Sequence, residues 1–250
     1  MGGDLEAWLV ERVVTLHASG PYRPPTPAER ARGVAGLRAL LAGATPESLR
    51  GLGFAVTAGP GHTLVAGHGA ARAWGALVLG ATPPQRVIEV PHPKSDRRTA
   101  RLGLELFLAT TGSALLVAGA HRDAAGGAAD VAHRDDSMFH AFAGVLAERA
   151  GAEIQLHGYA TATLPGVDAV VSPGAGTVLP EHTALRDALA DNGFRVHEGQ
   201  TGTLDGATNV QGIAAATRGT PFLHLELAPG ARADPTHRAA VVAAITATWP

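Results

Sequence analysis

The stretch Val87-Ile88-Glu89-Val90-Pro91-His92-Pro93-Lys94-Ser95-Asp96 is an apolar strand that runs directly into a polar turn. We expect the strand to end at His92 and a helix to begin at about Asp96. In open α/β sheets, functional side chains gather at the carboxyl ends of the strands. An imidazole and a carboxylate at this spacing could together bind one divalent cation. The alternative is that Asp96 complements a helix dipole and His92 is an ordinary turn residue.

Short apolar segments and amphipathic segments alternate along the rest of the chain. Apolar runs predict strands at 54–57, 63–66, 74–79, 86–90, 114–120, 153–157, 168–172, 194–197 and 221–227. Helical periodicity predicts helices at 4–16, 27–43, 96–110, 137–150, 181–192 and 235–249. This alternation predicts a three-layer α/β/α fold around a mostly parallel, mixed central sheet of the phosphorylase/hydrolase-like type. We expect one α/β domain over 1–250, in which residues 1–50 form a helical N-terminal extension.

Composition limits the classes of function. The chain has 250 residues, of which 46% are hydrophobic and 17% are charged, as expected for a globular protein. It has no cysteine, which excludes disulfides, thiolate metal sites and a cysteine nucleophile. The net charge is −2 and no basic stripe is present, so we expect no nucleic-acid partner. The apolar runs are too short to cross a bilayer and the first residues lack the features of a signal peptide, so we expect a cytoplasmic protein with no membrane partner.

A second strand ends in a histidine. His157 stands at the carboxyl end of the strand predicted at 153–157 and is followed by a glycine, so it is the natural third ligand beside His92 and Asp96. Two histidines and one carboxylate leave a coordination position open for water, as in hydrolytic zinc sites. We therefore predict one Zn2+ per chain, with another divalent metal as the alternative.

A third strand, predicted at 221–227, places His224 and Glu226 on one face and leucines on the other. A carboxylate in so apolar a strand is costly unless it is paired or functional. We interpret Glu226 as the general base that acts on water and later returns the proton to the leaving amine. A buried ion pair with an arginine such as Arg232 is the alternative.

Glu105 competes with Asp96 for the role of acidic ligand. It lies in the otherwise apolar stretch 102–107, where a charge is unexpected. If the helix begins at Asp96, Glu105 is about 13 Å further along it and too far from His92. If the segment up to Gly103 is a loop instead, Glu105 becomes the better ligand.

Several cationic side chains follow predicted strands or lie in polar loops, where they could bind a substrate. Arginine makes bidentate contacts with carboxylates. The candidates for substrate binding are Arg122, Arg134, Arg232, His121 and His133. Of these, His121 or His133 could also compete for the metal. We expect a small-molecule or peptide substrate that carries a carboxylate, whereas the oligomeric state is not predicted by these features.

The ordered set His92, Asp96, His157 and Glu226 resembles the zinc-dependent amidohydrolases related to N-formylglutamate amidohydrolase and N-acetylmuramoyl-L-alanine amidase. That group is akin in fold to zinc carboxypeptidases. The resemblance implies that the first three residues bind zinc and that the glutamate is the base.

The resemblance covers roughly residues 54–232. Within it, the segments 206–212 and 221–226 are similar to the approach to the last glutamate in the formylglutamate branch. Two features depart from the group. His92 and Asp96 are one residue further apart than in the carboxypeptidase-like H-x-x-E motif, and a proline and a lysine follow the histidine.

These features predict a metal-dependent hydrolase that cleaves an amide bond of an N-acyl amino acid or short peptide. Three alternatives remain open. One is a metal-independent hydrolase that uses Ser172 or Ser137, although neither serine lies in a full nucleophile-elbow motif. Another is a non-catalytic metal-binding protein derived from such hydrolases. The last is a nucleotide or sugar-phosphate binder that uses the glycine turns at 59–61 and 173–176.

Overall fold

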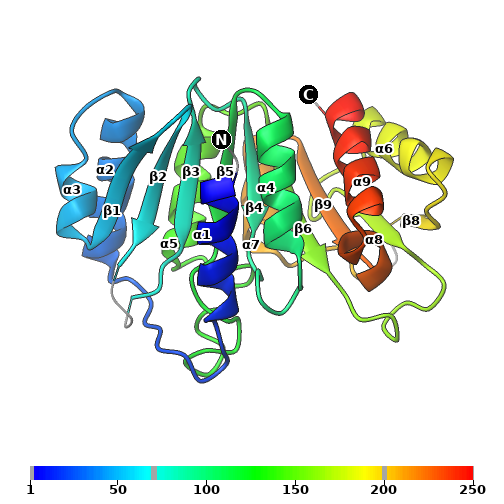
Figure 1. Cartoon of the computed structure of the whole chain (residues 1–250), viewed down its shortest axis with the longest axis horizontal. Helices are drawn as coiled ribbons and strands as arrows, with labels where there is room; N and C mark the ends of the chain where they lie inside the picture. The colour runs from blue at the N-terminus through cyan, green and yellow to red at the C-terminus, as the bar shows by residue number, and fades with distance from the viewer. Residues whose placement is uncertain (1–2, 69–71, 199–201, 250) are drawn as a thin grey trace.

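The computed structural model describes residues 3–68, 72–198 and 202–249. Within them, one nine-stranded mixed sheet has the spatial order β1-β2-β3-β5-β4-β6-β9-β7-β8 (Figure 1). The strands are β1 (Phe54–Gly59), β2 (His62–Gly67), β3 (Ala76–Gly80), β4 (Arg86–Val90), β5 (Ser113–Val117), β6 (Ala152–Gly158), β7 (Ala169–Ser172), β8 (Val196–Glu198) and β9 (Phe222–Leu227). The predicted three-layer α/β fold is thereby confirmed.

The centre of the sheet is parallel. Strands β5, β4, β6 and β9 pair in parallel, whereas β1, β2 and β3 form an antiparallel end, and β7 is antiparallel to β9. Central parallel strands are buried on both faces, which explains why Val87, Ile88 and Val90 in β4 are all fully buried. The carboxyl ends of β4, β6 and β9 therefore meet at one edge of the sheet.

Helices cover both faces of the sheet (Figure 1). One layer contains α1 (Gly3–Val14), α4 (Thr99–Ala109), α6 (Pro180–Asp191), α8 (Pro229–Ala233) and α9 (Pro235–Thr248). The other contains α2 (Pro27–Leu41), α5 (Met138–Ala147) and α7 (Val210–Arg218), with α3 (Glu47–Gly51) beside α2. The short helices α7 and α8 were not predicted. None of the described helices combines the length and apolar character needed to cross a membrane.

The predicted N-terminal extension is helical. Thr26 and Glu29 form a capping box at the start of α2, with the Glu29 amide 3.2 Å from Thr26 Oγ1 and the Thr26 amide 2.9 Å from Glu29 Oε2. The end of α1 is tied to the turn after β4, because Lys94 Nζ donates a hydrogen bond to Val14 O at 2.7 Å. The extension thus contacts the segment that carries His92 and Asp96.

Two glycines allow the backbones after β5 and before β3 to touch. Gly75 has φ +109°, and a Cβ there would lie 2.4 Å from Val117 O. A Cβ on Gly119 would lie 2.4 Å from Gly75 N. Only glycine fits both positions. This contact anchors the start of the loop that leads to Arg122.

We predict that Gly75→Ala lowers the free energy of unfolding by about 2 kcal/mol or more, because it combines a backbone clash with an unfavourable φ. The matched control is Gly144→Ala in α5, where a Cβ would meet nothing within 4 Å. That control should raise the free energy of unfolding by about 0.5–1 kcal/mol, through helix propensity. Chemical denaturation measures both, and equal effects from the two variants would contradict this account of Gly75.

Candidate metal centre

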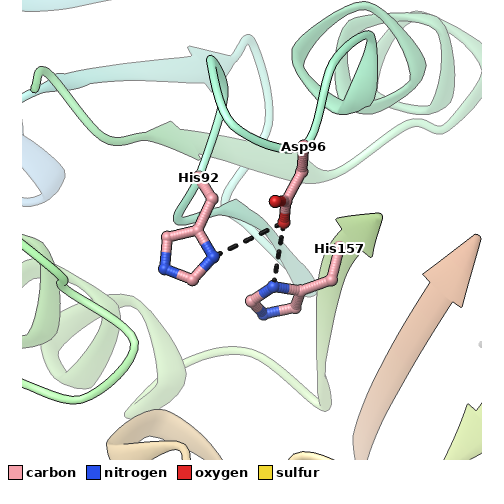
Figure 2. A group of neighbouring side chains, drawn as sticks. All are labelled: His92, Asp96 and His157. Carbon is pink, nitrogen blue, oxygen red and sulfur yellow. Dashed lines mark hydrogen bonds and ion pairs between the residues drawn. The ribbon is translucent and has the colours of Figure 1, made fainter. Parts of the chain in front are cut away.

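Three predicted ligands come together at the carboxyl ends of β4 and β6 (Figure 2). His92 lies just after β4, Asp96 in the following turn, and His157 near the end of β6. Asp96 Oδ2 is 3.4 Å from His92 Nδ1 and 3.2 Å from His157 Nδ1. One ligand atom from each residue lies within 4.8 Å of the others, and all three side chains are buried. The structure therefore brings together the three residues that were predicted from the sequence as metal ligands.

The hydrogen bonds of the two imidazoles orient their rings alike. His92 Nε2 is 2.7 Å from Asp130 Oδ1, and His157 Nε2 is 2.9 Å from Gln155 Oε1. Both partners are acceptors, so each Nε2 carries the proton and each Nδ1 presents its lone pair towards Asp96. Metal-binding histidines in proteins have this arrangement, with the remote N–H donated to a carboxylate or carbonyl oxygen. The donor set therefore fits one divalent cation.

Strand β9 brings two more titratable groups to the same place. Glu226 is the register partner of His157, and His224 is the register partner of Gln155. His157, His224 and Glu226 offer ligand atoms within 4.8 Å of one another. Glu226 Oε2 and His224 Nδ1 are buried and have no hydrogen-bond partner among the described residues. Because buried polar atoms are almost always satisfied, these two indicate a missing ligand or water.

Burial and pairing shift the protonation equilibria in opposite directions. Burial alone would raise the pKa of Asp96, but its contacts with His157 and His92 hold it below its usual range. Burial lowers the pKa of His157 and moves the pKa of His224 well below its ordinary value, so both rings are neutral near pH 7. Burial raises the pKa of Glu226 to about 8, and the charge of Asp96 adds to this shift. The neutral His157 and the ionised Asp96 are in the forms that bind a metal, whereas Asp130 and Asp96 raise the pKa of His92 against the effect of burial.

A buried network of polar side chains holds the His157 imidazole in place. Gln155 Oε1 accepts from His157 and also from Asn209 Nδ2, at 2.6 Å. Gln155 Nε2 donates to Glu89 Oε2 at 2.8 Å and to Gln211 Oε1 at 3.2 Å. These contacts fix which end of the Gln155 amide faces the imidazole, because its oxygen and nitrogen each have partners of the required type. The network therefore sets the protonation of His157.

Two of the predicted substrate-binding residues lie next to the centre. Asp130 joins them, because Arg122 Nη2 is 2.6 Å from Asp130 Oδ2 and His133 Nδ1 is 3.3 Å from the same oxygen. Arg122 Nη1 also lies 3.4 Å from His92 Nδ1. Of the two, Arg122 is thus placed beside the ligand atoms.

The other predicted substrate-binding residues are engaged elsewhere. Arg134 pairs with Asp136 at 2.7 Å on the surface. His121 Nδ1 accepts from the backbone N–H of Asp123 at 3.2 Å. Arg232 is buried and donates only to backbone carbonyls, among them Leu227 O at 3.1 Å and Tyr159 O at 2.9 Å. Its guanidinium therefore holds loops in place, and no ion pair joins it to Glu226 among the described residues.

The helix after the ligand turn starts later than predicted. α4 begins at Thr99 instead of Asp96, because Arg98 has φ +73°, a left-handed conformation that cannot belong to the helix. Asp96 therefore lies in a turn, where its side chain faces His157. The rival ligand Glu105 is in α4 and pairs with Arg238 at 2.9 Å.

The two serines considered as nucleophiles have local structural roles. Ser137 Oγ accepts from His140 N at 3.0 Å and caps α5. Ser172 Oγ donates to Asp205 O and accepts from Gly174 N at 2.9 Å. Both hydroxyls are thus used by turns or caps, which removes the support for a serine mechanism.

Asp130, Gln155 and Asn209 are the site residues that sequence reasoning missed. Gln155 had a usable signal, because it is two residues before His157 in the same strand and must share its face. Asp130 and Asn209 lie in loops, where no periodicity relates them to the ligands.

The fold and the donor set together define a class of protein: three-layer α/β proteins with acidic and imidazole side chains at the ends of central parallel strands. No protein-family model and no curated protein sequence matches this chain. Among solved structures, the chain is similar to a bacteriophage poly-gamma-glutamate hydrolase, with 14% identity and a TM-score of 0.52 over 69% of this chain and 86% of that one.

Two further solved structures are similar. One is an aspartoacylase family protein from Mesorhizobium loti, with 12% identity and a TM-score of 0.50 over 78% of this chain and 70% of that one. The other is N-formylglutamate amidohydrolase from Ralstonia eutropha JMP134, with 16% identity and a TM-score of 0.45 over 70% of this chain and 95% of that one. At these identities the likeness concerns the fold alone, and the two structures with TM-scores of 0.52 and 0.50 confirm the fold that the resemblance implied.

Glu89 generates a prediction about pH and stability. It is fully buried, its Oε1 has no described partner, and burial, with Glu153 nearby, raises its pKa well above 4.5. A raised folded-state pKa gives a stabilising contribution that is present below 4.5 and is lost as pH rises through the folded value. Glu89→Gln should therefore reduce the loss of unfolding free energy between pH 5 and pH 8 by about 1 kcal/mol or more.

Urea denaturation at both pH values measures this effect. Glu47→Gln, which changes an exposed glutamate of α3, serves as the control and should follow the wild type. A pH dependence in Glu89→Gln as steep as in the wild type would show that Glu89 is ionised in the folded protein.

Proposed function

We propose that this protein is a metal-dependent hydrolase that cleaves an amide bond of an N-acyl amino acid or a short peptide. The observation that carries the proposal is the convergence of His92 Nδ1, His157 Nδ1 and Asp96 Oδ2, with the unpartnered Glu226 Oε2 beside them. Two solved structures of similar fold are named as a poly-gamma-glutamate hydrolase and an aspartoacylase family protein, and both names fit this reaction class.

The bound cation is proposed to be zinc. Two imidazoles and one carboxylate are the protein ligands of many hydrolytic zinc sites, and they leave a coordination position open. A cation held there supplies Lewis acidity towards water and the scissile carbonyl. His92, Asp96 and His157 hold it, while Asp130 and Gln155 fix the two rings.

The chain's own side chains move the protons. In its ionised form, Glu226 accepts a proton from the attacking water and later delivers it to the leaving amine. It is suited to both steps because it is buried beside His157 and its Oε2 has no competing donor. Arg122, 3.4 Å from His92 Nδ1, is placed to donate to the oxyanion that forms on the substrate.

We predict that Glu226→Gln lowers kcat by about 10²–10⁴-fold and keeps one zinc per chain, because only the proton acceptor is lost. His157→Ala should lose the zinc as well as the activity. Elemental analysis and amide hydrolysis assays with N-acyl amino acids measure these outcomes, and His17→Ala, an exposed histidine, is the control. Full zinc-dependent turnover in Glu226→Gln would disprove its role, and zinc without turnover in the wild type would indicate a non-catalytic metal-binding protein.

The network under His157 gives a separate prediction. Gln155→Leu should weaken zinc affinity by about 10–100-fold, because the imidazole loses the acceptor that fixes its orientation. Gln211→Leu is the matched control, since it removes a buried glutamine of the same network that does not touch His157. Competition with a chelator measures both dissociation constants, and equal affinities in the two variants would contradict the role of Gln155.

A further inference from the structure

A cavity of about 450 Å³ lies beside the candidate metal centre. Its lining includes Ser95, Arg97, Arg98, Gly158, Tyr159 and Arg232. Ser95 precedes Asp96, and Gly158 follows His157, so the wall of the cavity continues the segments that carry two of the ligands. Ligands of α/β proteins bind at this edge, outside the carboxyl ends of the strands.

The cavity also approaches the proposed base. Arg232 Nε donates to Leu227 O at 3.1 Å, and Leu227 follows Glu226 directly in β9. Both Tyr159 and Arg232 line the cavity. Gly158, which also lines the cavity, donates its backbone amide to Asp96 Oδ2 at 3.2 Å, so the wall of the cavity is in direct contact with one of the candidate ligands.

The charge of the cavity wall is positive. Three arginines line it, and no acidic residue does so in the part of the chain that the structure describes. The guanidinium of Arg232 is already committed to backbone carbonyls, including that of Arg97. The side chains of Arg97 and Arg98 are exposed and make no hydrogen bond or ion pair with residues in the described ranges.

Two other arginines that were predicted to bind the substrate already have carboxylate partners. Arg122 pairs with Asp130 at 2.6 Å, and Arg134 pairs with Asp136 at 2.7 Å. A substrate carboxylate would have to compete with those aspartates. Arg97 and Arg98 have no such partner in the described ranges, so each guanidinium is available for a bidentate contact with a substrate carboxylate.

We propose that this cavity is the subsite for the substrate's carboxylate, and that Arg97 and Arg98 determine specificity for anionic substrates. The proposal rests on the proposed hydrolase function and names the part of the protein that selects an acyl amino acid over a neutral amide. It replaces Arg134 and Arg232 as carboxylate anchors.

The test is the double variant Arg97→Met/Arg98→Met, which keeps the length of the side chains and removes their charge. For any N-acyl amino acid that the wild type hydrolyses, KM should rise at least tenfold, whereas kcat should stay within about threefold and the zinc content should not change. KM for the corresponding carboxamide should be the same in variant and wild type. Arg50→Met, an exposed arginine of α3, controls for the loss of positive charge.

A binding measurement keeps this test separate from the test of hydrolysis. Glutarate and its neutral analogue glutaramide are titrated into wild type and variants by calorimetry. The wild type and Arg50→Met should bind glutarate, and the double variant should bind it at least tenfold more weakly. Equal glutarate affinity in the double variant, no glutarate binding by the wild type, or a fall in kcat at constant KM would each overturn the subsite. If the wild type hydrolyses no amide, the proposed function fails while the titration still decides the subsite.

Discussion

One carboxylate oxygen connects the segments of the candidate centre. Asp96 Oδ2 contacts His92 Nδ1 at 3.4 Å and His157 Nδ1 at 3.2 Å, and it accepts from the Gly158 amide at 3.2 Å. A buried carboxylate is tolerated only with such partners, because the cost of removing its charge from water is several kcal/mol. The contacts couple the turn after β4 to the end of β6. The other groups of the site lie around this contact between the two segments.

The two faces of the central strands bury different kinds of side chain. On the side of α4 and α9, residues such as Ile88, Ile154 and Leu225 are fully buried in an apolar cluster. Apolar burial contributes roughly 25 cal/mol per Å², so this face contributes stability. On the side of α5 and α7, Val87 and Leu116 belong to a second apolar cluster, but the same strands also present Glu89, Gln155 and the titratable groups of the site there. Those polar side chains cost free energy when buried, and the apolar face offsets that cost.

Local rules predicted the strands and the candidate ligands on them, because a strand end and a side-chain alternation are properties of a short segment. They placed His92 and His157 at one edge of the sheet, and that placement is confirmed by the contacts with Asp96. The rules failed where the deciding contact is distant. Asp130 is 38 residues from His92 in sequence, and no pattern relates them. The helix start was wrong because Arg98 has a left-handed backbone, whereas its residue type would suit a helix.

Strand β9 is the last strand in chain order, yet it lies between β6 and β7 in the sheet. During synthesis, the nascent chain can pair β4 with β6 and bring the histidines and Asp96 together well before Glu226 leaves the ribosome. Until then β6 has an unpaired edge, which is a surface for association with other chains. The order of strands thus keeps Glu226 away from His157 until β9 has been synthesised, and until then the edge of β6 that β9 covers stays open.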